Sequence, residues 1–414
     1  MSVEITRLAS GLRIVSESRR SVETVSVGVW VDAGSRHEPK PLNGVTHFLE
    51  HMLFKGTKTR SARDIVFEIE AVGGHMNAYT TRDNTTYYAR VLKDDMPLAV
   101  DVLADIIQNS VCAEVEIERE KEVILQEVGQ ALDTPDDIVF DHLQASAYGD
   151  QAIGRTILGE PDLIKSFKKE DLLGYLGQNY VASNIVISAV GNMKHSDLVK
   201  LVEDKLGDLP TGKASIITPS TYVGGRKIET RELEQVHLTA AWQGCSFHDD
   251  DYYAMQVYST ILGGGMSSRL FQEVREHRGL AYSVYSFTSS HAETGLFGLY
   301  AGTGPDMMDE LIPVVKGEMQ KLADGPEELE YKVATSQLKA SLLMALEATT
   351  SRMEQLGRQL LVFGRLIPVE EMVANVDAVS PDHVRSVAQK ICESTSPSIA
   401  IVGPGAFENV NFNK

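Results

Sequence analysis

Two histidines and a glutamate stand close together in an otherwise apolar stretch, GVTHFLEHMLFKG, at residues 44–56. His47 and His51 are four residues apart, so on a helix both imidazoles project from one face, one turn apart. Two imidazoles at this spacing can bind one divalent metal ion, and the carboxylate of Glu50 can reach a water on that ion. A lone buried histidine is more often a hydrogen-bonded core residue. Three such groups in an apolar helix need compensation for their burial, which favours a metal site.

A catalytic zinc ion usually takes three protein ligands and leaves one position for water, so a third ligand is needed. None of the other nine histidines has a partner at helical spacing. Glu120 and Glu127 lie seven residues apart in the helical stretch EVEIEREKEVILQEVGQAL. We expect Val123 and Ile124, on the same face, to point inward. Since a carboxylate on a buried face needs a cation or hydrogen bonds, we expect Glu127 to bind the metal with Glu120 in support behind it.

The elements that must position these residues occur twice. VSVGVWVDAG begins at Val25 and VHLTAAWQGC begins at Val236, an offset of 211 residues. ISAVGN contains Gly191 and IAIVGP contains Gly403, an offset of 212 residues. Between these anchors both halves run through strands, helices, further strands and long helices in one order. Two copies of one unit explain the nearly constant offset better than chance similarity does.

Strands that cluster apart from long helices favour an α+β fold over a doubly wound parallel sheet. We therefore expect two homologous α+β domains in tandem, each a mainly antiparallel sheet packed with helices. A stretch rich in proline and small residues, without helical periodicity, separates the halves. The predicted division is a metal-binding catalytic domain at residues 1–212, a linker at 213–226 and a homologous second domain at 227–414.

Composition limits the possible functions. The 414 residues suit two domains of about 200 residues each. A hydrophobic fraction of 43% and a charged fraction of 23% are typical of soluble globular proteins. The net charge of −19 disfavours binding to nucleic acids or to anionic membranes, because both need a basic surface. No apolar run approaches the roughly 18–20 residues that span a bilayer, so we expect no membrane insertion.

The cysteines and the first residues indicate the cellular compartment. Cys112, Cys245 and Cys392 show no CxxC spacing, so they predict neither a disulfide framework nor a thiolate metal site. A reducing compartment is the simplest interpretation. The start, MSVEITRLASGLRIV, has neither the basic and apolar regions of a secretory signal nor the arginine-rich composition of a transit peptide.

The combined motif resembles a known family. HFLEH at residues 47–51, followed 76 residues later by Glu127, resembles the pitrilysin-type (inverzincin) zinc endopeptidases. It is most similar to the branch that contains the catalytic subunit of mitochondrial processing peptidase and its bacterial relatives. The resemblance implies one Zn²⁺ per chain bound by His47, His51 and Glu127. It also implies that Glu50 is the general base and that Glu120 affects activity.

Further substrate contacts are implied by the resemblance. GGHMNAYTTRDNTTYY resembles the family's active-site edge strand, with Asn77 and Ala78 at positions that pair with the substrate backbone. REHRGLAY places Arg275 and Tyr282 seven residues apart, like the arginine–tyrosine pair of the non-zinc half. The resemblance implies that this pair contacts substrate near the scissile bond, and Tyr282 is expected to stabilise the developing oxyanion.

An acidic pair predicts a preference for arginine in the substrate. Asp137 and Asp141 lie four residues apart on a probable helix that follows Pro135, and two carboxylates on one face suit a guanidinium. Their positions match those with which processing peptidases bind an arginine two residues before the cleaved bond. Asp137 is shorter than the glutamate expected there. The alternative is that both are helix-start acids favoured by the macrodipole, an interpretation accepted for Asp136.

These features predict a zinc-dependent endopeptidase that cleaves extended or unfolded peptides inside a chamber formed by two chains. Larger family members place four such domains in one chain, so two domains imply a dimer, and a homodimer would supply both the zinc motif and the arginine–tyrosine pair. One alternative is a non-catalytic subunit of a respiratory-complex assembly, and another is a catalytic subunit that needs an inactive paralogue. The expected location is the bacterial cytoplasm or, for a mature form, the mitochondrial matrix.

Overall fold

The computed structural model describes residues 3–212, 217–405, 407 and 409–412. The chain forms two compact units. The first comprises Met1–Val128, Arg155–Thr218 and Met344–Leu366, and the second comprises Gly129–Gly154, Pro219–Leu343 and Ile367–Lys414. Each half of the sequence therefore contributes one segment to the unit that the other half mainly forms. The predicted boundaries at 1–212, 213–226 and 227–414 stay a prediction about the homologous halves, and residues 213–216 of the linker lie outside the described residues.

The first unit contains a six-stranded sheet with the order β1-β2-β6-β3-β5-β4. β2 and β6 pair in parallel, and the other neighbours pair antiparallel. β4 lies at the edge, where it pairs with β5. The strands are β1 (Val3–Arg7), β2 (Arg13–Ser18), β3 (Thr24–Val31), β4 (His75–Thr80), β5 (Thr85–Leu92) and β6 (Ile185–Gly191).

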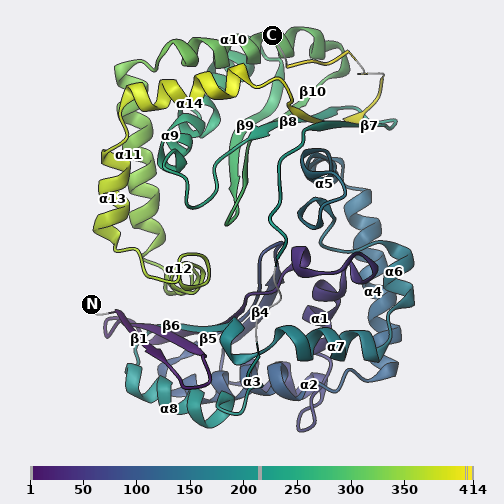
Figure 1. Ribbon diagram of the computed structural model, residues 1–414, viewed down its shortest axis with the longest axis vertical. Helices are drawn as coiled ribbons and strands as arrows, with labels where there is room; N and C mark the ends of the chain where they lie inside the picture. Colours follow the sequence, from purple (N-terminus) through teal and green to yellow (C-terminus); the bar gives the residue numbers. More distant parts are fainter. Residues whose placement is uncertain (1–2, 213–216, 406, 408, 413–414) are drawn as a thin grey trace. The chain divides into compact units, whose positions relative to one another are not determined.

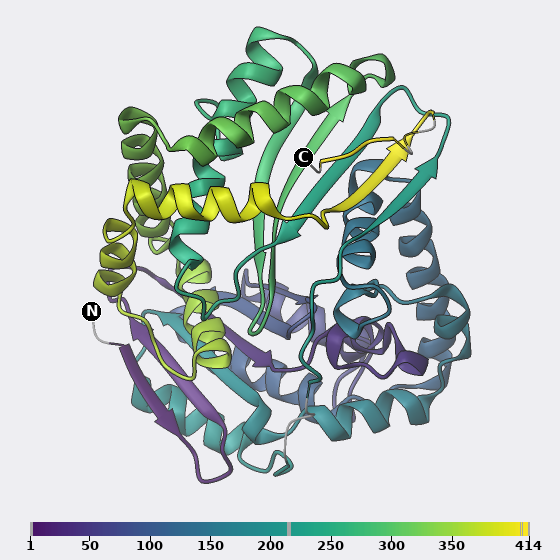
Figure 2. The ribbon, with the colours of Figure 1, turned by 45° about the horizontal axis from the view of Figure 1, so that its top comes forward.

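The second unit contains a five-stranded sheet with the order β7-β11-β8-β10-β9, whose strands run side by side in Figure 2. Here β7 and β11 pair in parallel, and the other neighbours pair antiparallel. β9 lies at the edge. The strands are β7 (Gly225–Thr230), β8 (Val236–Gln243), β9 (Ala281–Ser290), β10 (Gly295–Thr303) and β11 (Ser398–Gly403).

The two sheets share one plan, since β2-β6-β3-β5-β4 of the first follows the same pairing directions as β7-β11-β8-β10-β9 of the second. The anchors seen in the sequence meet each other in each sheet. A Cβ atom on Gly191 would lie 2.6 Å from the Cα of Val25, and one on Gly403 would lie 2.8 Å from the Cα of Val236. A side chain does not fit at either place, so glycine recurs there. The predicted pair of α+β units is confirmed.

The helices fall into the same two units, except that α4 runs across the boundary at Val128 and α11 runs across the boundary at Leu343. Those that belong mainly to the first unit are α1 (Val45–Leu53), α2 (Ala62–Ala71), α3 (Met96–Asn109), α4 (Glu114–Leu132), α6 (Pro161–Ser166), α7 (Lys169–Asn179), α8 (His195–Leu206) and α12 (Thr349–Val362). Those of the second are α5 (Pro135–Tyr148), α9 (Tyr252–Gly263), a π-helix (Phe271–His277), α10 (Met308–Asp324), α11 (Glu328–Ala345), α13 (Val369–Asp377) and α14 (Pro381–Glu393).

The exchanged segments each cover one face of a sheet. In the first unit α12 packs on β3 and β6, while α3 and α8 lie on the other side (Figure 1). Successive residues of β3 face alternate sides: Val27 and Val29 join the core with α3, and Trp30 packs on Met353 and Leu356 of α12. In the second unit α5 packs on β11 and β8, and α9, α10 and α14 contribute to the main core.

Short 3₁₀ helices complete the connections. They are Ser35–His37, Lys40–Leu42, Lys93–Asp95, Ala152–Gly154, Ala182–Asn184 and Pro305–Met307. None of the described helices combines the length and the hydropathy needed to cross a bilayer.

Candidate metal centre

The helix α1 carries the two histidines on a well-supported scaffold. Gly44 precedes it with a φ of 97°, a conformation that glycine adopts readily. The buried carboxylate of Glu38 accepts hydrogen bonds from the backbone N–H groups of Gly44 and Thr46, both at 2.8 Å, and from the amide of Asn43 at 2.9 Å. These bonds satisfy donors that the first helical turn would otherwise leave unpaired. Apolar residues of α1 are buried, which leaves the imidazoles on the remaining face.

The structure brings His47, His51 and Glu127 together. A ring nitrogen of each histidine and a carboxylate oxygen of Glu127 all lie within 4.8 Å of one another. The Oε2 atom of Glu127 is 3.6 Å from Nε2 of His47 and 3.5 Å from Nε2 of His51. Zinc bonds of about 2.0–2.2 Å in tetrahedral geometry place ligand atoms about 3.3–3.5 Å apart. The three side chains therefore fit one zinc ion.

His47 is in the protonation state that a metal ligand requires. Burial, with a smaller contribution from His51, lowers the pKa of His47 to about 3. The imidazole is then neutral at physiological pH and offers a lone pair. The Nδ1 atom of His47 is buried and has no hydrogen-bond partner among the described residues. His51 differs, because its Nδ1 lies 3.1 Å from Oε2 of Glu120 and donates to it, which leaves Nε2 facing the cluster.

Glu120 and Glu127 lie on α4, but the buried face of this helix differs in part from the expected one. Ile117, Glu120, Ile124 and Val128 are buried at spacings of three and four residues. Val123, expected to point inward, is 40% exposed. A residue adjacent to Ile124 is turned about 100° around the helix axis, out of this narrow stripe. The expectation for Val123 was therefore wrong.

Glu50 lies beside the cluster as a candidate base. Thr80 on the edge strand β4 donates a hydrogen bond of 2.6 Å from Oγ1 to Oε2 of Glu50. Burial raises the pKa of the Glu50 carboxyl and Glu127 adds to this, while the bond from Thr80 and the charge of His51 oppose it. A carboxyl whose pKa moves from its ordinary value toward neutrality is better matched to taking a proton from water.

The predicted substrate strand is the edge strand of the first sheet. Asn77 pairs with Tyr88 and Ala78 pairs with Tyr87, which leaves the other side of β4 without a neighbouring strand in the described sheet. The side-chain oxygen of Asn77 accepts a hydrogen bond of 2.9 Å from the backbone N–H of Ala78. This edge lies in the same unit as the two histidines and the three glutamates Glu50, Glu120 and Glu127.

Four other predicted residues belong to the second unit. The guanidinium of Arg275 lies 4.6 Å from the ring centroids of both Phe271 and Tyr282, a cation–π arrangement, and Tyr282 is exposed. Asp137 and Asp141 are on α5, and burial, followed by the charges of Asp141 and Asp136, raises the pKa of Asp137. The action of these four residues at the metal cluster of the first unit stays a prediction.

Three contacts near the cluster were missed by sequence reasoning. Lys55 lies 2.7 Å from Oε1 of Glu120, Thr80 binds Glu50, and Glu38 binds the start of α1. Lys55 follows His51 by four residues but lies beyond the end of α1 at Leu53, so helical spacing alone did not assign it to the histidine face. Thr80 and Glu38 reach the site through the tertiary fold and left no signal in the sequence.

Comparisons with known proteins show which families and proteins the chain is similar to. A family model described as Insulinase (Peptidase family M16) matches residues 13–161, and one described as Peptidase M16 inactive domain matches residues 166–338. The chain is 39% identical over 401 residues to a protein of Rickettsia felis named "Uncharacterized zinc protease", with 97% of both chains covered. It is 40% identical over 413 residues to the mitochondrial-processing peptidase subunit beta of Homo sapiens, covering 97% of this chain and 84% of that one.

Solved structures show the same fold. A crystal structure titled as a peptidase M16 inactive domain from Pseudomonas fluorescens has a TM-score of 0.91 at 22% identity, with 98% of both chains covered. A protease from Helicobacter pylori also has a TM-score of 0.91, at 20% identity, with 97% of this chain and 99% of that chain covered. At these identities the likeness concerns the fold alone.

Proposed function

Because the chain belongs to peptidase family M16, whose relatives include zinc proteases, we propose that it is a zinc-dependent endopeptidase acting on extended or unfolded peptides. The observation that carries this proposal is the meeting of His47, His51 and Glu127 at distances that fit one zinc ion, with Glu50 held beside them. A non-catalytic subunit would not need this arrangement.

The residues of the site have separate roles in peptide hydrolysis. A bound zinc ion supplies a Lewis acid that polarises the scissile carbonyl and lowers the pKa of the attacking water. Glu50 accepts a proton from that water and passes it to the leaving amine. Thr80 holds the Glu50 carboxylate by its hydrogen bond, and burial excludes bulk water from the base. Burial also keeps His47 neutral, as a ligand must be.

The edge of β4 is suited to binding substrate as an added strand. Main-chain hydrogen bonds along a sheet edge hold an extended peptide largely independently of its sequence. The N–H of Ala78 is occupied by the side chain of Asn77, so an incoming peptide carbonyl would displace that side-chain oxygen and release the Asn77 amide to contact the substrate. This mode requires an unfolded segment, because a folded substrate has already used its backbone groups.

The direct test of the proposed function combines metal removal with a change of the base. The purified chain should cleave an unstructured peptide, lose this activity with a chelator and regain it with zinc. Glu50→Gln should keep the zinc but lower kcat by about 10²–10⁴-fold. Glu118→Gln, an exposed change on α4, is the matched control and should keep full activity. A chain that binds zinc and cleaves no peptide at any protein concentration would contradict the proposal.

We further propose that two chains form the active chamber and that a homodimer suffices. The presence of both the zinc cluster and the Arg275–Tyr282 pair in one chain supports this proposal. In a mixture of Glu50→Gln chains with Tyr282→Phe chains, one of the two sites in a mixed dimer would be complete, so activity should partly return. No recovery despite demonstrated subunit exchange would show that the pair acts within its own chain or not at all. The alternative of a heteromeric processing peptidase predicts activity only after a different chain is added.

The preference for arginine is a proposal with its own test. Burial, followed by the charges of Asp141 and Asp136, raises the pKa of Asp137, and a bound guanidinium would relieve the charge repulsion. A partly desolvated charged pair contributes about 1.5–3 kcal/mol, or roughly ten- to a hundredfold in kcat/KM. Peptides with arginine two residues before the cleaved bond should be favoured over matched alanine peptides. Asp137→Asn with Asp141→Asn should remove most of the advantage, and an unchanged ratio would return both aspartates to the solvated surface.

The relatives are bacterial and mitochondrial. A location in the bacterial cytoplasm, or in the mitochondrial matrix as a mature form, stays a sequence-based prediction.

A further inference from the structure

A chain of three side chains runs from the end of α1 to the metal cluster. The ammonium nitrogen of Lys55 lies 2.7 Å from Oε1 of Glu120, and Oε2 of the same carboxylate accepts a hydrogen bond of 3.1 Å from Nδ1 of His51. The other nitrogen of His51, Nε2, is 3.5 Å from Oε2 of Glu127. Lys55 therefore contacts the cluster through Glu120 without contacting the metal position.

Among these three side chains, Glu120 is the one that needs a neighbouring cation. Its side chain is only 3% exposed, and a buried carboxylate is costly unless a positive charge and hydrogen bonds compensate it. The imidazole of His51 supplies one hydrogen bond, at Oε2. Lys55 supplies the charge, and its side chain, 31% exposed, keeps part of its contact with water. Both oxygens of Glu120 are thus engaged, one by each partner.

The orientation of the histidines depends on this contact more than usual. Metal-binding imidazoles are generally oriented by a hydrogen bond from the nitrogen that does not bind the metal. Among the described residues, Nδ1 of His47 has no such hydrogen-bond partner. The bond between Nδ1 of His51 and Glu120 is therefore the one orienting hydrogen bond that the described residues give to the two imidazoles. A change in the position of Glu120 would therefore change the orientation of the His51 imidazole relative to His47 and Glu127.

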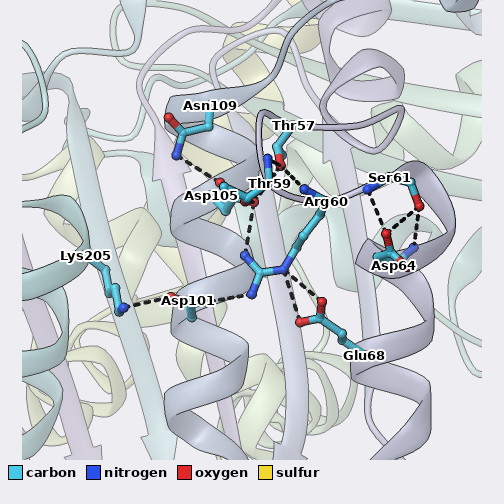
Figure 3. Close-up of polar contacts among 10 residues, drawn as sticks. All are labelled: Thr57, Thr59, Arg60, Ser61, Asp64, Glu68, Asp101, Asp105, Asn109 and Lys205. Atoms are coloured by element: carbon cyan, nitrogen blue, oxygen red, sulfur yellow. Dashed lines mark hydrogen bonds and ion pairs between the residues drawn. The ribbon is translucent and has the colours of Figure 1, made fainter.

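The backbone that carries Lys55 is fixed by the loop that follows α1. The N–H of Lys55 donates to Met52, Val111 donates to Gly56, and Lys58 donates to Asn109, which ties the loop to the end of α3 and the approach to α4. Beyond Lys55, Arg60 binds Glu68, Asp101 and Asp105, and the hydroxyls of Thr57 and Thr59 also bind Asp105 (Figure 3). Hydrogen bonds to the three carboxylates raise the pKa of Arg60 despite its partial burial.

We propose that Lys55 is a positioning residue of the metal centre: its ammonium holds Glu120 in the orientation that directs Nε2 of His51 at the metal. This inference rests on the proposed function through the zinc ligands His47, His51 and Glu127. The simpler alternative is an ordinary ion pair that ties the end of α1 to α4 and affects only stability. The two interpretations differ in what happens to zinc affinity when the fold is intact.

The test is zinc affinity, measured by competition with a chromophoric chelator on the full chain. Lys55→Met keeps much of the aliphatic stem and removes the charge, and it should weaken zinc binding by about 10–100-fold. Lys55→Arg restores a cation at the same place and should recover most of the affinity. Lys58→Met changes an exposed lysine of the same loop and should leave the affinity unchanged. Wild-type affinity in Lys55→Met would overturn the proposal.

A second background keeps the proposal testable if Lys55→Met is poorly folded. In Glu120→Gln the buried group is neutral and needs no cation, so adding Lys55→Met should weaken zinc binding less than threefold further. An equal loss in both backgrounds would show that Lys55 does not act through Glu120 and would also overturn the proposal. Failure of the proposed function is seen separately, because the wild-type chain would then bind no zinc at this site or would cleave no peptide when loaded.

Discussion

The helices α1 and α9 occupy equivalent places in the chain order of the two units. The helix α1 lies between strand β3 and the β4–β5 hairpin, and α9 lies between strand β8 and the β9–β10 hairpin. Both helices are tied to the edge strand of that hairpin through polar side chains. In the first unit Glu50 binds Thr80 of β4, whereas in the second Gln256 donates to Thr288 of β9 at 2.8 Å and Ser259 bonds Ser286 at 3.0 Å. Only α1 adds two imidazoles. The fold thus tolerates polar groups at this place in both units, and the two histidines of α1, together with Glu127 of α4, give the first unit its candidate metal cluster.

The two helices also differ in the acid near their N-termini. Glu38 beside α1 is buried, and desolvation raises its pKa to about 7 despite hydrogen bonds from Asn43, Thr46 and Gly44. Asp251, at the start of α9, is more exposed. Burial raises its pKa, but hydrogen bonds from Lys390 and His383 prevail and lower it below the ordinary value. The two acids near these helix starts therefore contribute to stability with opposite dependence on pH.

The largest expected effect is the loss of metal when the cluster of the first unit is broken. Glu127→Gln replaces a charged ligand with a neutral amide and should weaken zinc binding by more than a hundredfold, since even supporting residues cost 10–100-fold. Glu118→Gln, on the same helix, should have no effect. Zinc titration of both variants and of the wild type checks this and should give one zinc per chain. Full occupancy in Glu127→Gln would show that the third ligand was wrongly chosen, and a second zinc per chain would break the contrast between the units.

The sequence predicted the parts of this site that follow from local periodicity. The spacing of His47 and His51 predicted that both lie on one helix face, and the repeated anchors predicted two units of one fold. Glu127 lies with the histidines as expected, although its side chain is 39% exposed and lies beside the buried stripe of α4 rather than within it. The exchange of α5 and α12 between the units was not predictable, because an amphipathic helix shows that it has a buried face but not which sheet covers it. Glu38, Thr80 and Lys55 were missed because tertiary contacts bring them to the site.

A second prediction concerns the buried acid of the first unit. The pKa of Glu38 is about 7 in the folded protein and near 4.5 when unfolded, so the folded state binds the extra proton between these values. Its contribution to stability is fully present below about pH 4.5 and is lost as the pH rises through 7, a change on the order of 3 kcal/mol. Glu38→Gln should flatten this decline of the free energy of unfolding, measured by urea denaturation from pH 5 to pH 8. The exposed change Glu70→Gln should leave the slope intact, and an unaltered slope in Glu38→Gln would contradict the prediction.

A third prediction tests how closely the exchanged helix α12 packs on its sheet. A Cβ atom on Gly357 of α12 would lie 2.5 Å from Cδ2 of Trp30, which is fully buried under the helix. Gly357→Ala should therefore destabilise the first unit by about 1–3 kcal/mol, because the indole or the helix must shift. Gly317→Ala on α10 meets nothing within 4 Å and should be neutral or stabilising. Thermal unfolding of both variants tests this, and equal melting temperatures would mean that α12 is not packed as described.

The smallest expected effect completes the comparison of the two acids. Asp251 accepts hydrogen bonds from Nζ of Lys390 at 2.5 Å and from Nε2 of His383 at 2.8 Å. Because its folded pKa lies below 3.8, the stability it contributes is present above about pH 4 and is lost as the pH falls through the folded pKa. Partly exposed ion pairs are weak, so Asp251→Asn should cost only about 0.5–1 kcal/mol at pH 7, and this cost should shrink toward zero on acidification. Asp250→Asn, its exposed neighbour, provides the control, and urea denaturation at pH 7 and pH 3 measures both. A cost that grows on acidification would give Asp251 the same sign as Glu38, and the contrast between the two helix starts would then fail.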